Sequence, residues 1–236
     1  MKKIVTIAVI AFTFYACTDD ESVPGQKTDP AGKASLKKST AESPANPLNP
    51  NDSIGALYGL LYENYEPVTT GTVFTDSLAA DVLSFALQED DFAGLATGES
   101  PLLQAVVVQG VYDSASQNFD SALSQTSLSA AGRASLASLA ATFSVLKEAG
   151  AGFDAVHEAI TNYEQGIGTD ASLPEGDRAL LFTTAALLRY ELDVQRRKKR
   201  KDRDWEMSVG HIAAAAYGAS EGAPEAILYG LITAYP

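Results

Sequence analysis

Few stretches of this sequence carry residue types that could do chemistry, and most lack the surroundings that the chemistry requires. Gly218-Ala219-Ser220-Glu221-Gly222 matches the G-x-S-x-G pattern of a nucleophile elbow. An elbow needs a strand before the serine and a histidine after it, whereas an alanine run precedes Ser220 and no histidine follows. The stretch instead predicts a break between two helices rich in small residues.

Cofactor and metal motifs are also incomplete. Gly150–Ala155 has the letters of a dinucleotide fingerprint, but no strand–helix–strand pattern surrounds it, so we expect a turn between helices. The only histidines, His157 and His211, lie outside any H-E-x-x-H motif. The acidic run 89–91 lacks the glycine-punctuated loop of an EF-hand and favours a solvated helix end. We therefore predict no metal and no cofactor.

A basic run is the strongest local electrostatic feature of a chain with a net charge of −13. Residues 39–188 include only three basic residues and nineteen acidic ones. This excess of negative charge disfavours a nucleic-acid partner. The run could bind an anion such as a lipid phosphate, an acidic glycan or an acidic protein. Alternatively, it is a helix end that complements the helix dipole. The candidate anion-binding residues are Arg196, Arg197, Lys198, Lys199, Arg200, Lys201 and Arg203.

The first residues predict an export signal. Two lysines precede the apolar run 4–15, which is shorter than the roughly 20 residues that span a bilayer. Ala16 then precedes Cys17, the only cysteine of the chain, at the position where a lipoprotein cysteine is acylated. We expect residues 1–16 to be a lipoprotein signal peptide and Cys17 to carry lipid, palmitate included. The alternative is an ordinary cleaved signal with an unmodified cysteine.

Composition divides the remaining chain in two. Residues 17–51 are rich in Ser, Thr, Pro, Gly and Lys and cannot bury enough apolar surface to offset their ordering entropy, which predicts a lipidated N-terminus and a disordered tether. Residues 52–236 carry apolar side chains at three- and four-residue spacing. This pattern predicts one all-α domain, a multi-helix bundle, although the β-branched run 106–108 could form a short strand.

The spacing predicts helices that begin near residues 52, 75, 101, 129, 152 and 174. Gly166 and Gly168 are expected to end the helix that begins near residue 152. The longest helix runs from residue 174 into the basic run. Two i,i+4 pairs near its end predict that this end is solvated; they are Glu191–Gln195 and Asp193–Arg197.

Small residues recur at every fourth position of the C-terminal segment 204–236. This spacing forms a groove that lets two helices approach closely, so we predict a helical hairpin that closes the domain. The alternatives are self-association and insertion of the hairpin into a target membrane. The expected helix-packing residues are Gly210, Ala214, Gly218, Gly222, Ala226, Gly230 and Ala234.

The run KDRDWEMSVGHI, residues 201–212, together with the signal, resembles small uncharacterised lipoproteins of Bacteroidota-type bacteria. The acidic run 18–21 resembles the residues that follow the lipidated cysteine in their surface-exported lipoproteins. The resemblance implies a lipid anchor in the cell envelope, at the outer membrane and exposed at the surface. It implies no activity.

We expect a non-enzymatic binding or assembly role, with a partner that is an unknown envelope protein or glycan. One alternative is an all-α enzyme that uses carboxylates such as Glu63, Asp81 and Asp120; three or more acids around a buried cavity would favour it. The other is a secreted antagonist with a membrane-perturbing C-terminal hairpin.

Overall fold

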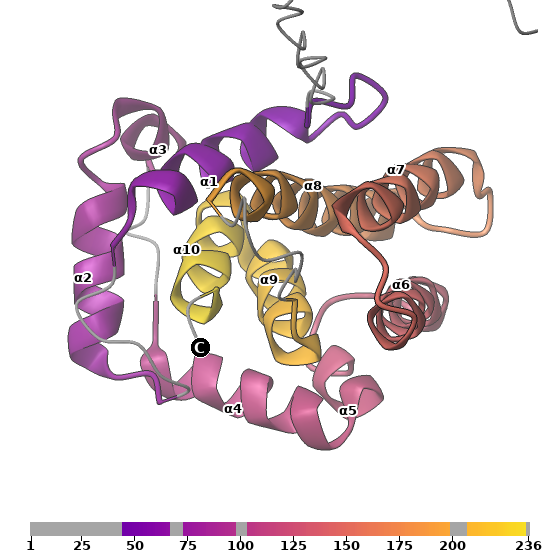
Figure 1. Cartoon of the computed structure of the whole chain (residues 1–236). Helices are drawn as coiled ribbons and strands as arrows, with labels where there is room; N and C mark the ends of the chain where they lie inside the picture. The colour runs from indigo at the N-terminus through magenta and orange to yellow at the C-terminus, as the bar shows by residue number, and fades with distance from the viewer. Residues whose placement is uncertain (1–43, 67–72, 98–102, 199–206, 235–236) are drawn as a thin grey trace, which may run out of the picture. The chain divides into compact units, whose positions relative to one another are not determined.

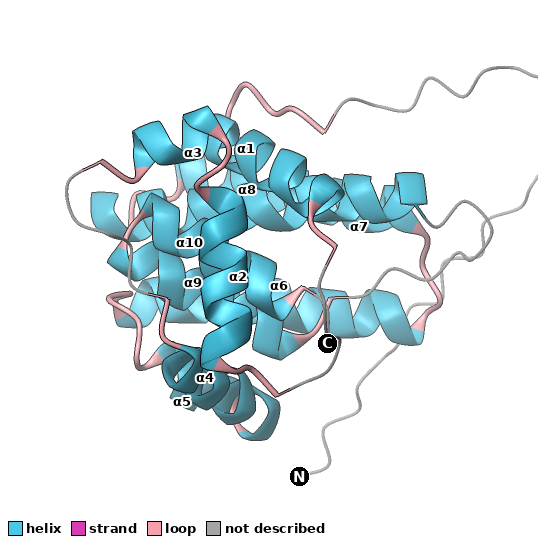
Figure 2. Cartoon of the chain, turned by 90° about the vertical axis from the view of Figure 1, so that its left-hand side faces the viewer, coloured by secondary structure: helices cyan, strands magenta, loops and turns pink. Residues whose placement is uncertain are grey.

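The computed structural model describes residues 44–66, 73–97, 103–198 and 207–234. All regular structure in these ranges is helical, so the predicted all-α bundle is confirmed (Figure 2). The signal 1–16, Cys17 and residues 18–43 lie outside them. The ten described helices are α1 (Asp52–Asn64), α2 (Asp76–Ala86), α3 (Asp90–Leu95), α4 (Ala105–Gln117), α5 (Phe119–Leu123), α6 (Ala130–Glu148), α7 (Phe153–Thr169), α8 (Glu175–Lys198), α9 (Val209–Glu221) and α10 (Ala223–Thr233).

The C-terminal pair α9 and α10 lies at the centre of the domain (Figure 1). α10 contacts α1, α2, α3, α4 and α8, and α9 contacts α4, α5 and α8. α8 in turn packs between α1 and α7. None of the described helices is both long enough and apolar enough to cross a bilayer.

Most of α8 is buried, and residues 180–188 have only apolar side chains and threonine on every side of the helix. From Leu180 to Gln195 every residue except Tyr190 is buried, including four with charged or amide side chains. A helix that is apolar all round belongs in the interior of a domain. Its polar side chains must therefore find partners inside the protein.

Side-chain caps start several helices. Thr75, Ser129 and Ser208 each accept a hydrogen bond from the backbone N–H three residues later. These bonds satisfy one of the free donors at a helix start. The predicted helix starts near residues 75 and 129 are confirmed.

Other boundaries differ from expectation. α7 continues through Gly166 and Gly168 to Thr169, because Ile167 is buried in the core and its burial outweighs the roughly 1 kcal/mol that each glycine costs. The run 106–108 lies within α4, and the acidic run 89–91 begins α3 rather than ending a helix. α3 and α5 were not predicted, since five or six residues are too few to show a helical period.

Residues 44–51 pack on the domain, whereas we expected the tether to extend to residue 51. Asn46 and Asn49 are buried and donate hydrogen bonds to Glu164 of α7, over 2.7 and 2.6 Å. Asparagine side chains thus anchor this segment, although it has almost no apolar residue to bury. Composition alone does not reveal such an anchor.

Two of the described glycines, Gly150 and Gly218, show why this residue type is needed where they stand. Gly150 has φ 63°, a left-handed conformation that turns the chain between α6 and α7, in the stretch expected to be a turn. Gly218 lies so close to α10 that a Cβ there would be 2.5 Å from the carbonyl oxygen of Glu225. The two helix backbones therefore approach closely at this point.

The other expected helix-packing residues meet different neighbours. A Cβ on Gly210 would meet the ring of Tyr112, and one on Gly230 would meet Tyr58 and Leu187, so at these positions side chains rather than a backbone fill the space. The remaining positions are two fully buried alanines, the joint between α9 and α10, and the C-cap of α10: Ala214, Ala226, Gly222 and Ala234.

We predict that Gly218→Ala lowers the melting temperature, because the added methyl group collides with backbone and overpacking costs about 1–3 kcal/mol. The matched control is Gly166→Ala. It adds the same methyl group to a helical glycine with nothing within 4 Å, so it raises stability by up to about 1 kcal/mol. Thermal unfolding followed by circular dichroism measures both. Equal melting temperatures for the two variants would show that α9 and α10 do not approach this closely.

Candidate functional site

Two clusters of polar side chains lie along α8. The first, here called the arginine cluster, consists of Asn46, Asn49, Asp52, Glu164 and Arg189. Arg189 and Glu164 are completely buried, and the Nε atom of Arg189 lies 3.0 Å from Oε2 of Glu164. The same carboxylate accepts the amide groups of both asparagines, so every bond converges on one buried charge.

Asp52 completes the arginine cluster from the first turn of α1. Its Oδ1 atom lies 2.5 Å from Nη2 of Arg189, and its Oδ2 accepts a hydrogen bond of 3.0 Å from Tyr190. Its position also places a negative charge at the positive end of the α1 dipole. The cluster therefore joins the segment before α1 to α7 and α8 through groups far apart in sequence.

We predict that Arg189→Met destabilises the domain by about 3–5 kcal/mol, because it leaves the buried Glu164 carboxylate without its cation. The control is Arg197→Met, which removes an exposed arginine paired with Glu63 and should change stability by no more than about 1 kcal/mol. Urea unfolding of both variants provides the comparison. Similar losses in the two would mean that the arginine cluster is not a buried charge pair.

The second cluster, here called the Glu–His cluster, consists of Tyr58, Glu191, Gln195, His211 and Thr233. Glu191 and His211 are buried, at 1% and 2% exposure. The Glu191 carboxylate accepts hydrogen bonds from the Tyr58 hydroxyl, over 2.8 Å, and from the Gln195 amide, over 2.9 Å. Four helices, α1, α8, α9 and α10, thus contribute to it.

Hydrogen-bond directions assign a proton to the Nδ1 atom of His211. The Thr233 hydroxyl donates to the carbonyl oxygen of Tyr229 over 2.6 Å, so its oxygen accepts from Nδ1–H of His211 over 2.9 Å. The Nε2 atom lies 2.7 Å from Oε2 of Glu191. The ring of His211 and the Glu191 carboxylate are therefore in direct contact in the interior of the domain.

The ring does not form a well-aligned hydrogen bond with Glu191. Nε2 is buried and close to the carboxylate, but the angle is outside hydrogen-bond geometry. The two side chains are therefore in close contact without an aligned hydrogen bond.

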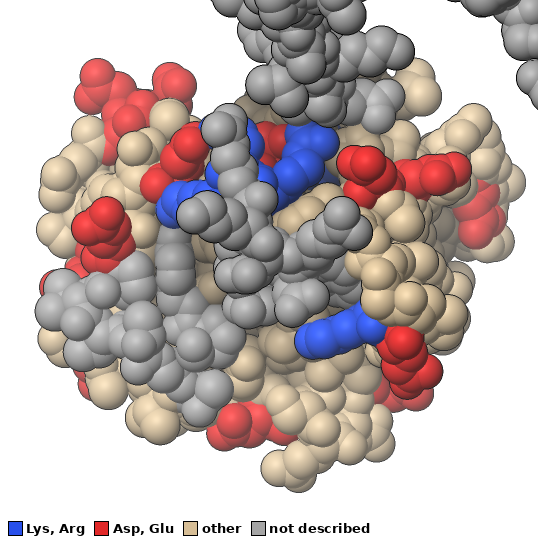
Figure 3. Space-filling view, viewed as in Figure 1, with Lys and Arg blue, Asp and Glu red and all other residues tan. Residues whose placement is uncertain are grey.

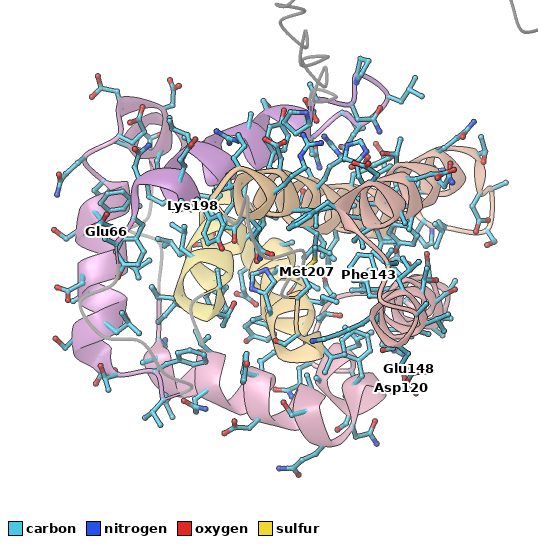
Figure 4. The ribbon with its side chains drawn as sticks, in the orientation of Figure 1. Glu66, Asp120, Phe143, Glu148, Lys198 and Met207 are labelled. Atoms are coloured by element: carbon cyan, nitrogen blue, oxygen red, sulfur yellow. The ribbon has the colours of Figure 1, made fainter. Side chains whose placement is uncertain are left out.

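A pocket of about 180 Å³ adjoins the Glu–His cluster. α6 and the ends of α9 and α10 form its walls; Met207, which lines it, lies near the centre of the view in Figure 4. Ser208, the N-cap of α9, is also at the pocket. Among the described residues, the lining consists of Lys147, Glu191, Met207, Ser208, His211, Thr233 and Ala234.

Three of the predicted anion-binding residues lie within the described chain, and acidic or aromatic groups of the domain engage all three. Arg196 pairs with Asp193 over 2.6 Å, and Arg197 pairs with Glu63 over 2.7 Å. The Lys198 ammonium lies 5.4 Å from the centroid of the Tyr62 ring. In Figure 3 the few basic side chains on this face lie among acidic and uncharged ones. Lys199, Arg200, Lys201 and Arg203 lie outside the described residues.

The carboxylates suggested for an enzyme are distributed over three helices. Glu63 is on α1, Asp81 on α2 and Asp120 on α5, and Glu63 is paired with Arg197. Figure 4 shows Asp120 at the lower right, on the opposite side from Glu66. No group of three or more His, Cys, Asp or Glu side chains that could hold a metal occurs in the described part of the chain.

Of the described residues at the pocket, only Ala234 was among the predicted site residues, and it was expected to pack helices. The pairs Glu191–Gln195 and Asp193–Arg197 do form, over 2.9 and 3.1 Å, but the prediction of a solvated end is wrong because Glu191, Asp193 and Gln195 are buried. The signal that could have indicated an interior position is the preceding run 180–188, which has only apolar residues and threonine on every side of the helix.

We predict that stability decreases above about pH 10, because burial and the nearby Asp52 raise the pKa of Tyr190 to about 12. Burial, with Tyr217, Glu221 and Glu225 close by, likewise raises the pKa of Tyr229 to about 12. Below their ordinary pKa of 10.0 both phenols are protonated in the folded and the unfolded chain. Between the two values only the unfolded chain ionises, so the free energy of unfolding falls.

Urea midpoints measured at about pH 9 and about pH 11 test this shift. The double variant Tyr190→Phe, Tyr229→Phe is the comparison and should show a smaller decrease between the two pH values. An identical decrease in both proteins would assign the effect to other groups.

The Glu–His cluster and its pocket are the best candidate site, because they combine buried polar atoms with space for a ligand. No family model, curated protein or solved structure matches this chain.

Proposed function

We propose that this chain is a lipid-anchored protein of the bacterial cell envelope that binds a small molecule without catalysing its reaction. The observation that carries the binding role is the pocket of about 180 Å³ at the Glu–His cluster. An apolar cavity of about 150 Å³ is large enough for benzene, so this pocket is large enough for one small molecule.

The chemistry of the lining is typical of a binding site. Met207 and Ala234 provide apolar contact, while Ser208, His211 and Lys147 provide polar groups that could orient a ligand. The Glu–His cluster is also held from four helices, which supports a site formed before the ligand arrives.

Base catalysis is a poor fit to the same groups. Both oxygens of Glu191 already accept hydrogen bonds from the protein, and the Nε2 atom of His211 is buried beside that carboxylate. A general base must be free to take a proton from its substrate. This arrangement supports binding rather than catalysis.

The lipid anchor rests on the sequence, with Cys17 directly after a small residue and an apolar run. The resemblance of residues 201–212 to Bacteroidota-type lipoproteins agrees with it. We do not propose self-association through the small residues of α9 and α10, because Gly210, Gly218 and Gly230 contact groups inside the domain.

The anchor is tested by expressing the full chain in a Gram-negative host and fractionating its membranes. Wild-type protein should be found in the membrane fraction, and mass spectrometry should identify an acylated N-terminal Cys17. Cys17→Ala is the control and should leave that fraction. An unacylated N-terminus at another residue would contradict the anchor.

The binding role is tested with a library of small molecules screened by thermal shift on the detergent-extracted protein. Hits should disappear in Ala234→Phe, which fills the pocket, and persist in Ala141→Phe, which adds the same ring at an exposed position of α6. Hits that survive in both variants would show that binding occurs elsewhere. An absence of hits would contradict the binding role.

A further inference from the structure

We propose that residues 44–51 form a releasable latch, which docks on α7 and α8 as one preformed unit and comes off as one unit while the helices stay folded. In Figure 1 this segment, here called the latch, is the indigo loop that leads into α1. The latch does not depend on the pocket or on its ligand. Three observations support it: its local bonds, the group that holds it, and its lack of apolar burial.

Two consecutive turns of the same kind shape the latch. In the first turn the backbone N–H of Asn49 donates to the carbonyl oxygen of Asn46 over 2.9 Å, and in the second Asp52 donates to Asn49 over 3.1 Å. Each turn has asparagine at its first position and proline, Pro47 or Pro50, at its second. These are residues that such turns favour, so the shape of the latch is encoded locally.

The asparagine side chains serve both the turns and the docking. The Oδ1 atom of Asn46 accepts the backbone N–H of Leu48 over 3.1 Å. Asn49 repeats this bond with Asn51 over 2.8 Å, so the turns orient both amides. The two Nδ2 atoms donate to different oxygens of Glu164, over 2.7 and 2.6 Å. Because one local structure holds both donors and one carboxylate accepts them, we expect them to engage and to separate together.

The latch buries almost no apolar surface. Leu48, its only large aliphatic side chain, is 69% exposed, and Pro47 and Pro50 are exposed as well. The remaining bonds to α8 are polar too, since side-chain amides donate to backbone carbonyl oxygens and to a threonine hydroxyl. Segments with few buried apolar contacts open at a free energy well below that of global unfolding. Release would therefore leave the apolar core intact.

The charged groups under the latch keep their partners when it is off. Glu164 still pairs with Arg189 over 3.0 Å, and Arg189 still pairs with Asp52. Water would replace the two amides at the Glu164 carboxylate. No buried charge is thus left without a partner, which is the state that strongly destabilises a domain.

Release would lengthen the connection between the domain and the residues that precede it in the chain. The latch has eight residues, which span about 26–29 Å when fully extended. Its docked and released states therefore give this connection two different lengths. Asn46 also donates its backbone N–H to Asp52 over 3.0 Å, so release removes a bond from the first turn of α1.

Hydrogen exchange of single backbone amides, measured by NMR on the detergent-extracted full-length protein, tests the latch. Its five hydrogen-bonded amides should share one protection factor, because a single opening exposes all of them. We expect this factor to be at least about tenfold above that of an unstructured chain and more than about a hundredfold below that of the buried α8 amides. The five amides are those of Asn46, Leu48, Asn49, Asn51 and Asp52.

The variant Asn49→Ala should abolish the protection of all five amides, because it removes one donor to Glu164 and the acceptor for Asn51. The α8 amides should lose no more protection than the wild-type latch possesses, since that factor is the whole contribution of docking to stability. The matched control is Asn64→Ala, which removes an exposed asparagine from the last turn of α1 and should leave the latch amides unchanged.

Several results would overturn the latch. Equal protection in the latch and in α8 would show that the segment opens only when the domain unfolds. Widely different protection among the five amides would show fraying residue by residue, and no protection in the wild type would show that the segment is not docked. A loss in α8 that exceeds the protection factor of the latch would make the segment part of the core. An equal effect of Asn64→Ala would show that the bonds to Glu164 do not hold the latch.

Discussion

The structure depends on one constraint, which is that α8 has no face toward solvent. The helix places four charged or amide side chains in the interior, along with the leucines and alanines around them: Arg189, Glu191, Asp193 and Gln195. A buried charge without a partner costs several kcal/mol, so each neighbouring element must supply one. The arginine cluster and the Glu–His cluster are the two results of this requirement.

These two clusters recruit different parts of the chain. Arg189 pairs with Glu164 of α7, and Glu164 also accepts hydrogen bonds from the two asparagines that precede α1. Glu191, two residues later, accepts a hydrogen bond from Tyr58 of α1 and contacts His211 of α9. Two nearby positions on one helix thereby determine the packing on two sides of the domain, and the second side includes the pocket.

The fold class could be predicted from periodic apolar residues and caps such as Ser129, because these are local signals. The end of α7 could not be predicted, since burial of Ile167 overrides the local preference of the glycines beside it. The site could not be predicted from local sequence patterns either, because Glu191 and His211 come together only when α8 and α9 pack. The run 180–188, without a charged residue on any side, was visible in the sequence and is the signal that places α8 in the interior.

The arginine cluster also determines how the domain would carry mechanical load. On the proposed lipid anchor, tension from the membrane would enter the described domain at residue 44, and Asn46 and Asn49 would meet it before α1 does. Both asparagines bond to Glu164 of α7, which pairs with Arg189 of α8. The tension would therefore be shared by α7 and α8 instead of unwinding α1 from its first turn. The hydrogen bonds of the two asparagines would hold the start of the domain in place, so that movement of the anchor does not reach the pocket.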